Sequence, residues 1–171
     1  MSGLTKDDWL LDSHSCPGFK NYEYVEHLET GKQVHHTEYV HVHIPKRYAI
    51  VNIQQQIEEI VRKSKVFDGT CLISTHHITT GIFVNDAESG LLEDISKWIE
   101  NLAPFGLDYR HHQTGEDNAD SHLKAYLTNN SLLVPITGGR IDFGTWQTIF
   151  YAEFDGKRDK RITVKTMGMM Q

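Results

Sequence analysis

The sequence predicts a single domain of mixed α and β structure, in the α+β class. Two stretches alternate apolar and polar residues with the period of a strand, at Val40–Ile44 and Trp146–Phe154. Two others space their apolar residues along one face of a helix, at Ile53–Val61 and Leu91–Leu102. A chain of 171 residues is long enough to bury roughly 70% of its unfolded surface. This length favours one compact domain.

The first 33 residues differ from the rest because they are polar and show no sustained period. Cys16-Pro17-Gly18 and Thr30-Gly31-Lys32 are turn signals, so we interpret this part as an appended arm with one strand near Tyr22–Leu28. Among the first residues the longest apolar run is Trp9-Leu10-Leu11. Neither a signal peptide nor a spanning helix is expected there.

The pattern sharpens from Val34 onward. A half-buried strand through Val40–Ile44 leads to a helix that Asn52 precedes, with Gln55 at the spacing of a capping box. Asp68-Gly69 predicts a turn after this helix, which leads into the apolar strand Thr70–Thr75.

A second strand and helix follow in the middle of the chain. Ile82–Val84 predicts a short strand, and the helix at Leu91–Leu102 is stopped by Pro104. Residues 106–117 predict a polar loop, after which Asn118 is placed to cap a third helix.

The last third predicts strands and tight turns. In order these are the strand Leu132–Ile136, the hairpin signal Gly138-Gly139, the long strand Trp146–Phe154, the turn Asp155-Gly156 and the strand Arg161–Met167. Alternation in the long strand predicts that Trp146 packs in the core with Phe150, and that Gln147 lies on the opposite face with Glu153.

The charge and composition of the chain argue against nucleic acid and membranes as partners. The net charge of −6 gives no overall basic surface for nucleic acid, and no Lys/Arg-rich amphipathic stretch indicates a membrane surface. Cys16 and Cys71 form no CxxC pair, which favours reduced thiols. We expect a soluble cytoplasmic protein whose partner is a small molecule.

Three of the eleven histidines lie inside short polar signatures: His77 in HITTGIFVND, His111 in YRH and His122 in NADSH. Imidazole binds divalent metals and titrates near neutrality, so three of them together would form either an open metal site or an acid/base cluster. A hydrogen-bonded core histidine is the other interpretation of each. We expect these three to share one polar cleft, outside which lie four others, His14, His27, His35 and His36.

The basic turn from Asp155 to Arg161 has two interpretations. Such turns are most often solvated, yet Arg158 or Arg161 aimed at a cleft would bind phosphate through two parallel hydrogen bonds. The segment Thr79-Thr80-Gly81 would supply hydroxyls and a backbone N–H to the same anion. The chain has no GxxxxGK[ST] pattern, so no nucleotide cofactor is expected.

Together these signatures resemble the YjbQ-like family of small proteins. HITTGIFVND is similar to the family pattern HTTAGxxxNE, from which it departs at positions that include Ile78 and Asp86. The later elements match in order: Tyr109-Arg110-His111, Asn118-Ala119 with His122-Leu123-Lys124, Gly144-Thr145-Trp146-Gln147, and Glu153 with Asp155-Gly156-Lys157-Arg158 and Arg161. The match divides the chain into an N-terminal extension, residues 1–37, and a YjbQ-like domain, residues 38–171.

The resemblance implies a compact mixed sandwich of mainly antiparallel strands with about three helices, which forms homotrimers. A secondary thiamine-phosphate synthase activity is attributed to the family: a pyrimidine-methyl diphosphate is joined to a thiazole phosphate, with release of pyrophosphate. The expected catalytic residues are then His77, His111, His122 and Glu153. The expected substrate-binding residues are Thr79, Thr80, Gly81, Asn85, Asn118, Gln147, Arg158 and Arg161.

Two other functions stay open. One is a metal-dependent hydrolase of a small phosphorylated or acyl substrate, with His77, His111 and His122 as zinc ligands and Asp86 or Glu153 as base. An all-imidazole site suits zinc better than magnesium, whereas a diphosphate-releasing synthase calls for magnesium. The other is a non-catalytic trimer that binds a metal or a metabolite.

Overall fold

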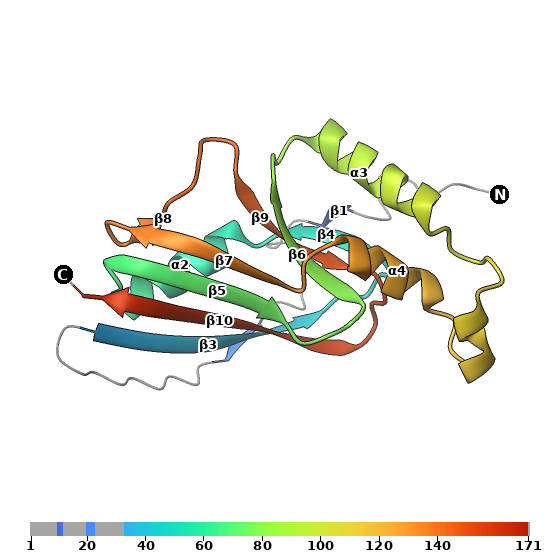
Figure 1. The fold of residues 1–171 in the computed structure, drawn as a ribbon, viewed down its shortest axis with the longest axis horizontal. Coiled ribbons are helices and arrows are strands. Elements are labelled where there is room, and N and C mark those ends of the chain that lie inside the picture. The colour runs from blue at the N-terminus through green and yellow to red at the C-terminus, as the bar shows by residue number, and fades with distance from the viewer. Residues whose placement is uncertain (1–9, 12–19, 23–32, 171) are drawn as a thin grey trace.

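The computed structural model describes residues 10–11, 20–22 and 33–170, which form two sheets (Figure 1). The smaller sheet has the order β1 (Leu10–Leu11), β4 (Ala49–Asn52), β9 (Thr148–Glu153), β6 (Thr80–Asn85). The larger has the order β2 (Lys20–Tyr22), β3 (Gln33–His43), β10 (Asp159–Met169), β5 (Asp68–Thr75), β7 (Ser131–Thr137), β8 (Arg140–Ile141). All neighbouring strands are antiparallel except β1 and β4. The predicted mixed α+β class is confirmed.

In the described part of the chain three α-helices flank the sheets, together with a short 3₁₀ helix η1 (Arg110–Thr114). Helix α2 (Gln54–Ser64) follows Asn52, whose side-chain oxygen accepts from the Gln54 backbone N–H at 3.0 Å. Helix α3 (Ser89–Leu102) begins where the Glu88 carboxylate accepts from two backbone N–H groups. Helix α4 (Ala119–Leu127) follows η1 directly. Residues 106–117 are therefore not a plain loop, because η1 lies within them.

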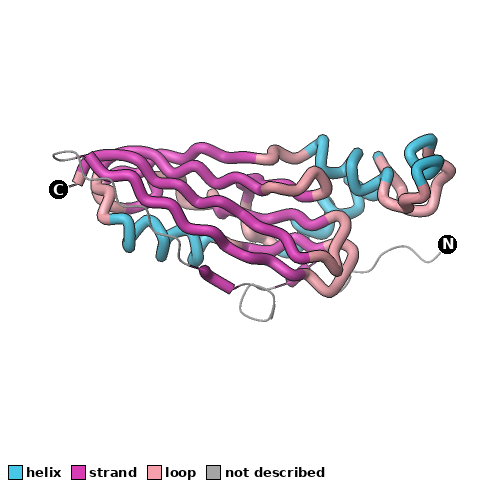
Figure 2. The backbone as a smooth tube through the Cα atoms, turned by 90° about the horizontal axis from the view of Figure 1, so that it is seen from below, coloured by secondary structure: helices cyan, strands magenta, loops and turns pink. Residues whose placement is uncertain are grey.

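The main hydrophobic core joins both sheets to α2. It contains side chains such as Val40 and Val164 of the larger sheet, Tyr151 of the smaller sheet and Ile57 of α2. The view in Figure 2 shows α2 lying along one side of the strands, with the other helices gathered at one end of the molecule. This end is where the site described below is built.

Strand β9 is buried on both faces, which corrects one expectation. Ile149 and Tyr151 enter the main core, whereas Phe150 packs with Leu92 of α3 on the opposite face. Alternation therefore carries no information about exposure along β9. Trp146, predicted to be a core residue, lies before the strand and is 73% exposed.

The predicted turn at Asp68-Gly69 is also wrong, because both residues belong to β5. They pair with Met169 and Gly168 of β10. A Cβ on Gly69 would lie 2.2 Å from the Met167 carbonyl oxygen, so glycine here permits a close backbone approach. The chain turns earlier, at Lys65, which has a left-handed φ of 59°.

The remaining predicted strands overlap β3, β6, β7, β9 and β10, whereas β1 and β4 were not predicted. Gly138 and Gly139, with φ of 60° and 77°, connect β7 to β8 as the hairpin signal indicates. The strand expected near Tyr22–Leu28 coincides with β2 only at Tyr22, since residues 23–28 lie outside the described part. No helix among the described residues is long and apolar enough to span a bilayer.

Candidate functional site

The polar segment His77–Gly81 connects β5 to β6 and is held by hydrogen bonds at both ends. The Thr80 hydroxyl bonds the Thr75 hydroxyl and donates to the His77 carbonyl at 2.9 Å. The Phe154 backbone N–H donates to the Thr79 carbonyl at 3.1 Å, which ties the segment to the end of β9. His77 thus projects from a fixed connection.

Helix α4 brings a second predicted histidine to this connection. His77 and His122 line one hollow of about 570 Å³, and Tyr126, one helical turn beyond His122, lines it as well. The His111 ring, from η1, stands edge-on against the His122 ring with centroids 4.9 Å apart. The structure therefore gathers the three predicted histidines at one end of the molecule.

The pKa values of the two hollow-lining histidines lie below the ordinary value of imidazole. Burial lowers the pKa of His77, and the positive charges of Lys160 and Arg161 lower it further. Burial likewise lowers the pKa of His122, as does His111, against the opposing effect of nearby carboxylates. Both imidazoles are favoured in their neutral form.

Glu153, a predicted catalytic residue, lies fully buried behind the His77–Gly81 segment. Its carboxylate accepts from Lys160 Nζ, from the Tyr151 hydroxyl at 2.9 Å and from the Asp155 backbone N–H at 2.9 Å. Burial raises the pKa of Glu153, and these donors oppose that shift. Lys160 also donates to the Thr79 hydroxyl at 3.1 Å. The buried pair of Lys160 and Glu153 thus supports the His77–Gly81 segment through Thr79. Glu153 itself does not line the hollow.

Arg161 lies on the outer face of β10, beside His76. Its guanidinium carbon stands 4.6 Å from the centre of the Tyr39 ring, and its carbonyl accepts from the His76 backbone N–H. His76 lines the hollow and bonds the Thr163 hydroxyl through Nε2. Arg161 does not itself line the hollow, and within the described part of the chain it forms no ion pair with a carboxylate.

Arg158 lies elsewhere, at a smaller cavity of about 230 Å³ that Arg47 also lines. Its guanidinium is 3.5 Å from both Glu116 and Asp155. Asn118, at the start of α4, does not cap the helix with its side chain but donates to Asp155 at 3.0 Å. The structure therefore separates Arg158 and Asn118 from the hollow.

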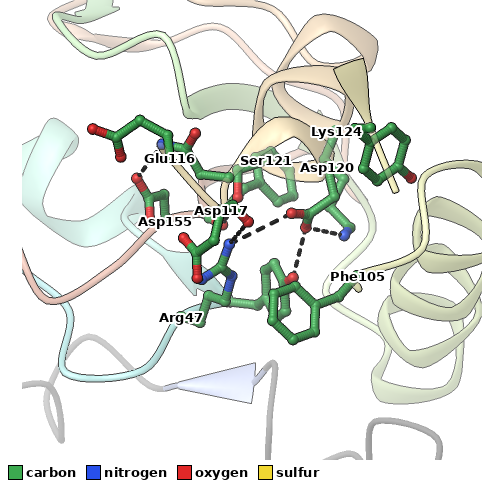
Figure 3. Close-up of polar contacts among 12 residues, drawn as sticks. Arg47, Phe105, Glu116, Asp117, Asp120, Ser121, Lys124 and Asp155 are labelled. Carbon is green, nitrogen blue, oxygen red and sulfur yellow. Dashed lines mark hydrogen bonds and ion pairs between the residues drawn. The ribbon is translucent and has the colours of Figure 1, made fainter. Parts of the chain in front are cut away.

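A buried ionic network, absent from the sequence prediction, holds α4 in place (Figure 3). The Asp120 carboxylate accepts from the Tyr48 hydroxyl and from Lys124 Nζ, each at 2.6 Å. Lys124 is fully buried and pairs with Glu100 of α3 at 2.9 Å. Arg47 reaches the same cluster through Asp117 at 3.1 Å and Asp120 at 3.5 Å. The i,i+4 spacing of Asp120 and Lys124 around His122 is the one signal in the sequence that pointed to this pair.

A family model described as UPF0047 protein YjbQ-like matches residues 38–169. The chain belongs to this family. A UPF0047 protein from Archaeoglobus fulgidus is 44% identical over 122 residues, which are 71% of this chain and 94% of the relative. The crystal structure of a YbjQ-like protein from Sulfolobus solfataricus P2 aligns with a TM-score of 0.75 at 34% identity, over 80% of this chain and 99% of that one. The crystal structure of a hypothetical protein from Aeropyrum pernix K1 aligns with a TM-score of 0.72 at 30% identity. The alignment covers 77% of this chain and 98% of that one.

The YjbQ-like signatures do not all meet within one chain. Thr79, Thr80 and Gly81 lie at the histidine end of β6, whereas Asn85 lies at its other end. Asn85 pairs with Thr148, next to Gln147, whose side chain accepts from the Gly144 backbone N–H at 2.8 Å. Five residues of strand separate the ends of β6 by about 17 Å. Asn85 and Gln147 therefore stand apart from the hollow.

The histidines of this YjbQ-like protein do not form a metal centre as they lie. Among the described residues no group of three or more His, Cys, Asp or Glu side chains is placed to hold a metal ion. The His77, His111 and His122 set thus lacks the converging geometry of a three-ligand zinc site. Of the histidines expected outside the cleft, His35 and His36 lie on β3, and His14 and His27 fall outside the described residues.

Proposed function

We propose that this protein is a cytoplasmic enzyme of the thiamine-phosphate synthase type, which joins a pyrimidine-methyl diphosphate to a thiazole phosphate. The observation that carries the proposal is the hollow shared by His77 and His122, two imidazoles from separate elements that are held by their surroundings. The hollow has the size of a small-molecule site. The choice of this reaction rests on the synthase activity that the resemblance to YjbQ-like proteins implies.

The charges around the hollow favour an anionic substrate. Arg161 stands unpaired with any carboxylate in the described part of the chain, and Lys160 lies behind His77. Arg161 and Lys160 together depress the pKa of His77, which shows that their positive potential reaches the imidazole. A diphosphate at this edge would accept hydrogen bonds from the Arg161 guanidinium and from His76.

The reaction needs a proton on the leaving group, which the imidazoles are suited to supply. The thiazole nitrogen attacks the methylene carbon, the bond from that carbon to the diphosphate oxygen breaks, and its electron pair departs with pyrophosphate. A protonated imidazole then donates to the departing oxygen. Negative charge from the substrate raises the pKa of His77 and His122 again, so binding of the diphosphate itself favours the proton-loaded form.

The protein also works as a homotrimer in this proposal. Asn85 and Gln147 match the family signatures but lie at the far end of β6 and β9 from the histidines. They would reach a histidine hollow only from a neighbouring copy. This arrangement explains why signature residues lie at both ends of β6 within one chain.

Incubating the purified protein with both thiamine precursors and measuring pyrophosphate release tests the proposal. We expect His77→Asn and His122→Asn each to reduce the rate about 10²- to 10⁴-fold, the usual contribution of a general acid. His43→Asn is the matched control, because His43 lies on the outer end of β3 and bonds Asp159 instead of lining the hollow. Wild-type protein that releases no pyrophosphate but carries stoichiometric zinc would instead favour the hydrolase or the metal-binding alternative.

A further inference from the structure

The hollow has an apolar side that the acid/base chemistry does not use. Ile78 and Tyr126 both line it, and they are 77% and 88% exposed. Tyr126 makes no hydrogen bond or ring contact within the described part of the chain. Two large side chains thus stand in solvent at a site whose other lining residues, Ala125 excepted, are polar.

Each of these side chains is adjacent to one histidine. Ile78 follows His77 directly, and Tyr126 lies one helical turn beyond His122 on the same face of α4. Residues four apart on a helix have Cβ atoms about 6 Å from one another. An apolar group seated on Ile78 and Tyr126 would therefore place its neighbouring bonds within reach of both imidazoles.

We propose that Ile78 and Tyr126 bind a flat heteroaromatic ring of the substrate, while the phosphate of the substrate lies toward Arg161 and His76. The proposal rests on the proposed function and specifies which residues recognise the ring. An aromatic ring of the ligand packs on the Tyr126 face, and Ile78, which lines the same hollow, supplies an aliphatic surface. A cationic ring gains further from the Tyr126 π-face.

Calorimetric titration with two probes tests the assignment: thiamine phosphate, which has rings, and pyrophosphate, which has none. We expect Tyr126→Ala and Ile78→Ala to weaken thiamine phosphate binding about tenfold or more, equivalent to about 1.4 kcal/mol. Pyrophosphate binding should stay within twofold of wild type. Tyr126→Phe should keep the affinity for thiamine phosphate, because the ring and not the hydroxyl makes the contact.

Trp98→Ala is the matched control, since Trp98 is a similarly exposed aromatic residue on α3 that does not line the hollow. Both hollow variants alter exposed side chains, and unchanged melting temperatures will show that folding is intact. If Tyr126→Ala weakens neither probe, or weakens both equally, the ring assignment is overturned while anion binding stands. If wild-type protein binds neither probe, the proposed function itself fails.

Discussion

At the scale of single residues, the charge of each histidine is governed by what lies behind it. Burial is the main cause of the lowered pKa of His77, and the positive charge of Lys160, which Glu153 holds in the interior, lowers it further. His122 has a mixed surrounding, because His111 opposes its protonation and Asp155 and Asp120 favour it. The hollow therefore prefers neutral imidazoles until an anion arrives.

This electrostatic balance predicts a ligand-dependent titration. In the free protein the folded-state pKa of His77 and of His122 is below 6.5, so each takes up its proton only as the pH falls below that of an ordinary imidazole. Binding of pyrophosphate should raise both values, and protons should be taken up on binding. NMR titration of the imidazole signals with and without pyrophosphate measures this directly. Unmoved signals at saturating pyrophosphate would place the anion elsewhere.

The two arginines of the basic turn should differ in their effect on phosphate binding. Arg161→Lys keeps the charge but loses the planar fork, so pyrophosphate affinity should fall by about 1 kcal/mol or more. Arg158→Lys alters an exposed side chain already paired with Glu116 and should change affinity by less than about 0.5 kcal/mol. Titrating pyrophosphate into both variants compares them. The reverse order would assign the anion to the smaller cavity beside Arg47.

At the scale of elements, α4 is attached to the rest of the molecule by polar groups more than by apolar ones. Its buried side chains are Ala119, Asp120, Ser121, Lys124 and Ala125. The Ser121 hydroxyl donates to the Phe154 carbonyl at the end of β9. Buried charges are costly unless every partner is present, so this attachment fixes one orientation of the helix and of His122.

Removing one donor from this network should therefore destabilise the fold. Burial and the nearby Asp120 hold the pKa of Tyr48 well above its usual value, so the hydroxyl remains a donor. Tyr48→Phe removes the bond to Asp120, and we expect a loss of about 1.5–3 kcal/mol in the free energy of unfolding. Urea denaturation measures it. Tyr109→Phe is the control, because within the described part of the chain its hydroxyl bonds only a backbone carbonyl, that of Pro104. Equal losses in the two variants would contradict a special role for the network.

At this scale the sequence predicted what depends on local periodicity, and failed where contacts between distant residues decide. Helix α2 and strand β5 carry strong local periods, and their kinds were predicted correctly. The position of Trp146 was predicted wrongly, because it lies in the turn before β9, where the alternation of the strand does not extend, and is exposed. The burial of Lys160 was not predicted either. In the sequence it belongs to a charged turn and resembles a solvated residue, and only its packing against Glu153 makes it a core residue.

At the scale of the whole molecule, the two sheets are unequally covered. The smaller sheet has the main core on one face and packs against α3 and α4 on the other. Along β3 and β10 of the larger sheet, by contrast, fully buried residues alternate with more exposed ones. Leu133 of β7 is 61% exposed and Met169 of β10 is 46% exposed. A second copy that covers such side chains would bury apolar surface now open to water.

We therefore expect a homotrimer in solution at micromolar concentration. Light scattering coupled to size exclusion should give three times the mass of 19.6 kDa computed for one chain. Trp146→Ala, which removes an exposed side chain beside Gln147, should leave the fold intact and shift the equilibrium toward smaller species. A monomer mass for the wild type would count against signatures that meet between copies.

The pairing of β3 with β10 has a consequence for how the chain is made. His43 lies opposite Asp159, 116 positions further along, and among the described strands β3 has no other long neighbour, since β2 pairs with it at only three residues. At ribosomal speeds of 5–20 residues per second, β3 waits on the order of ten seconds for its partner strand to be synthesised. Throughout that interval its unpaired edge is open to other chains. The demand on cellular chaperones should therefore rise with the time that β3, like β4 and β5, waits for a partner strand made late in synthesis.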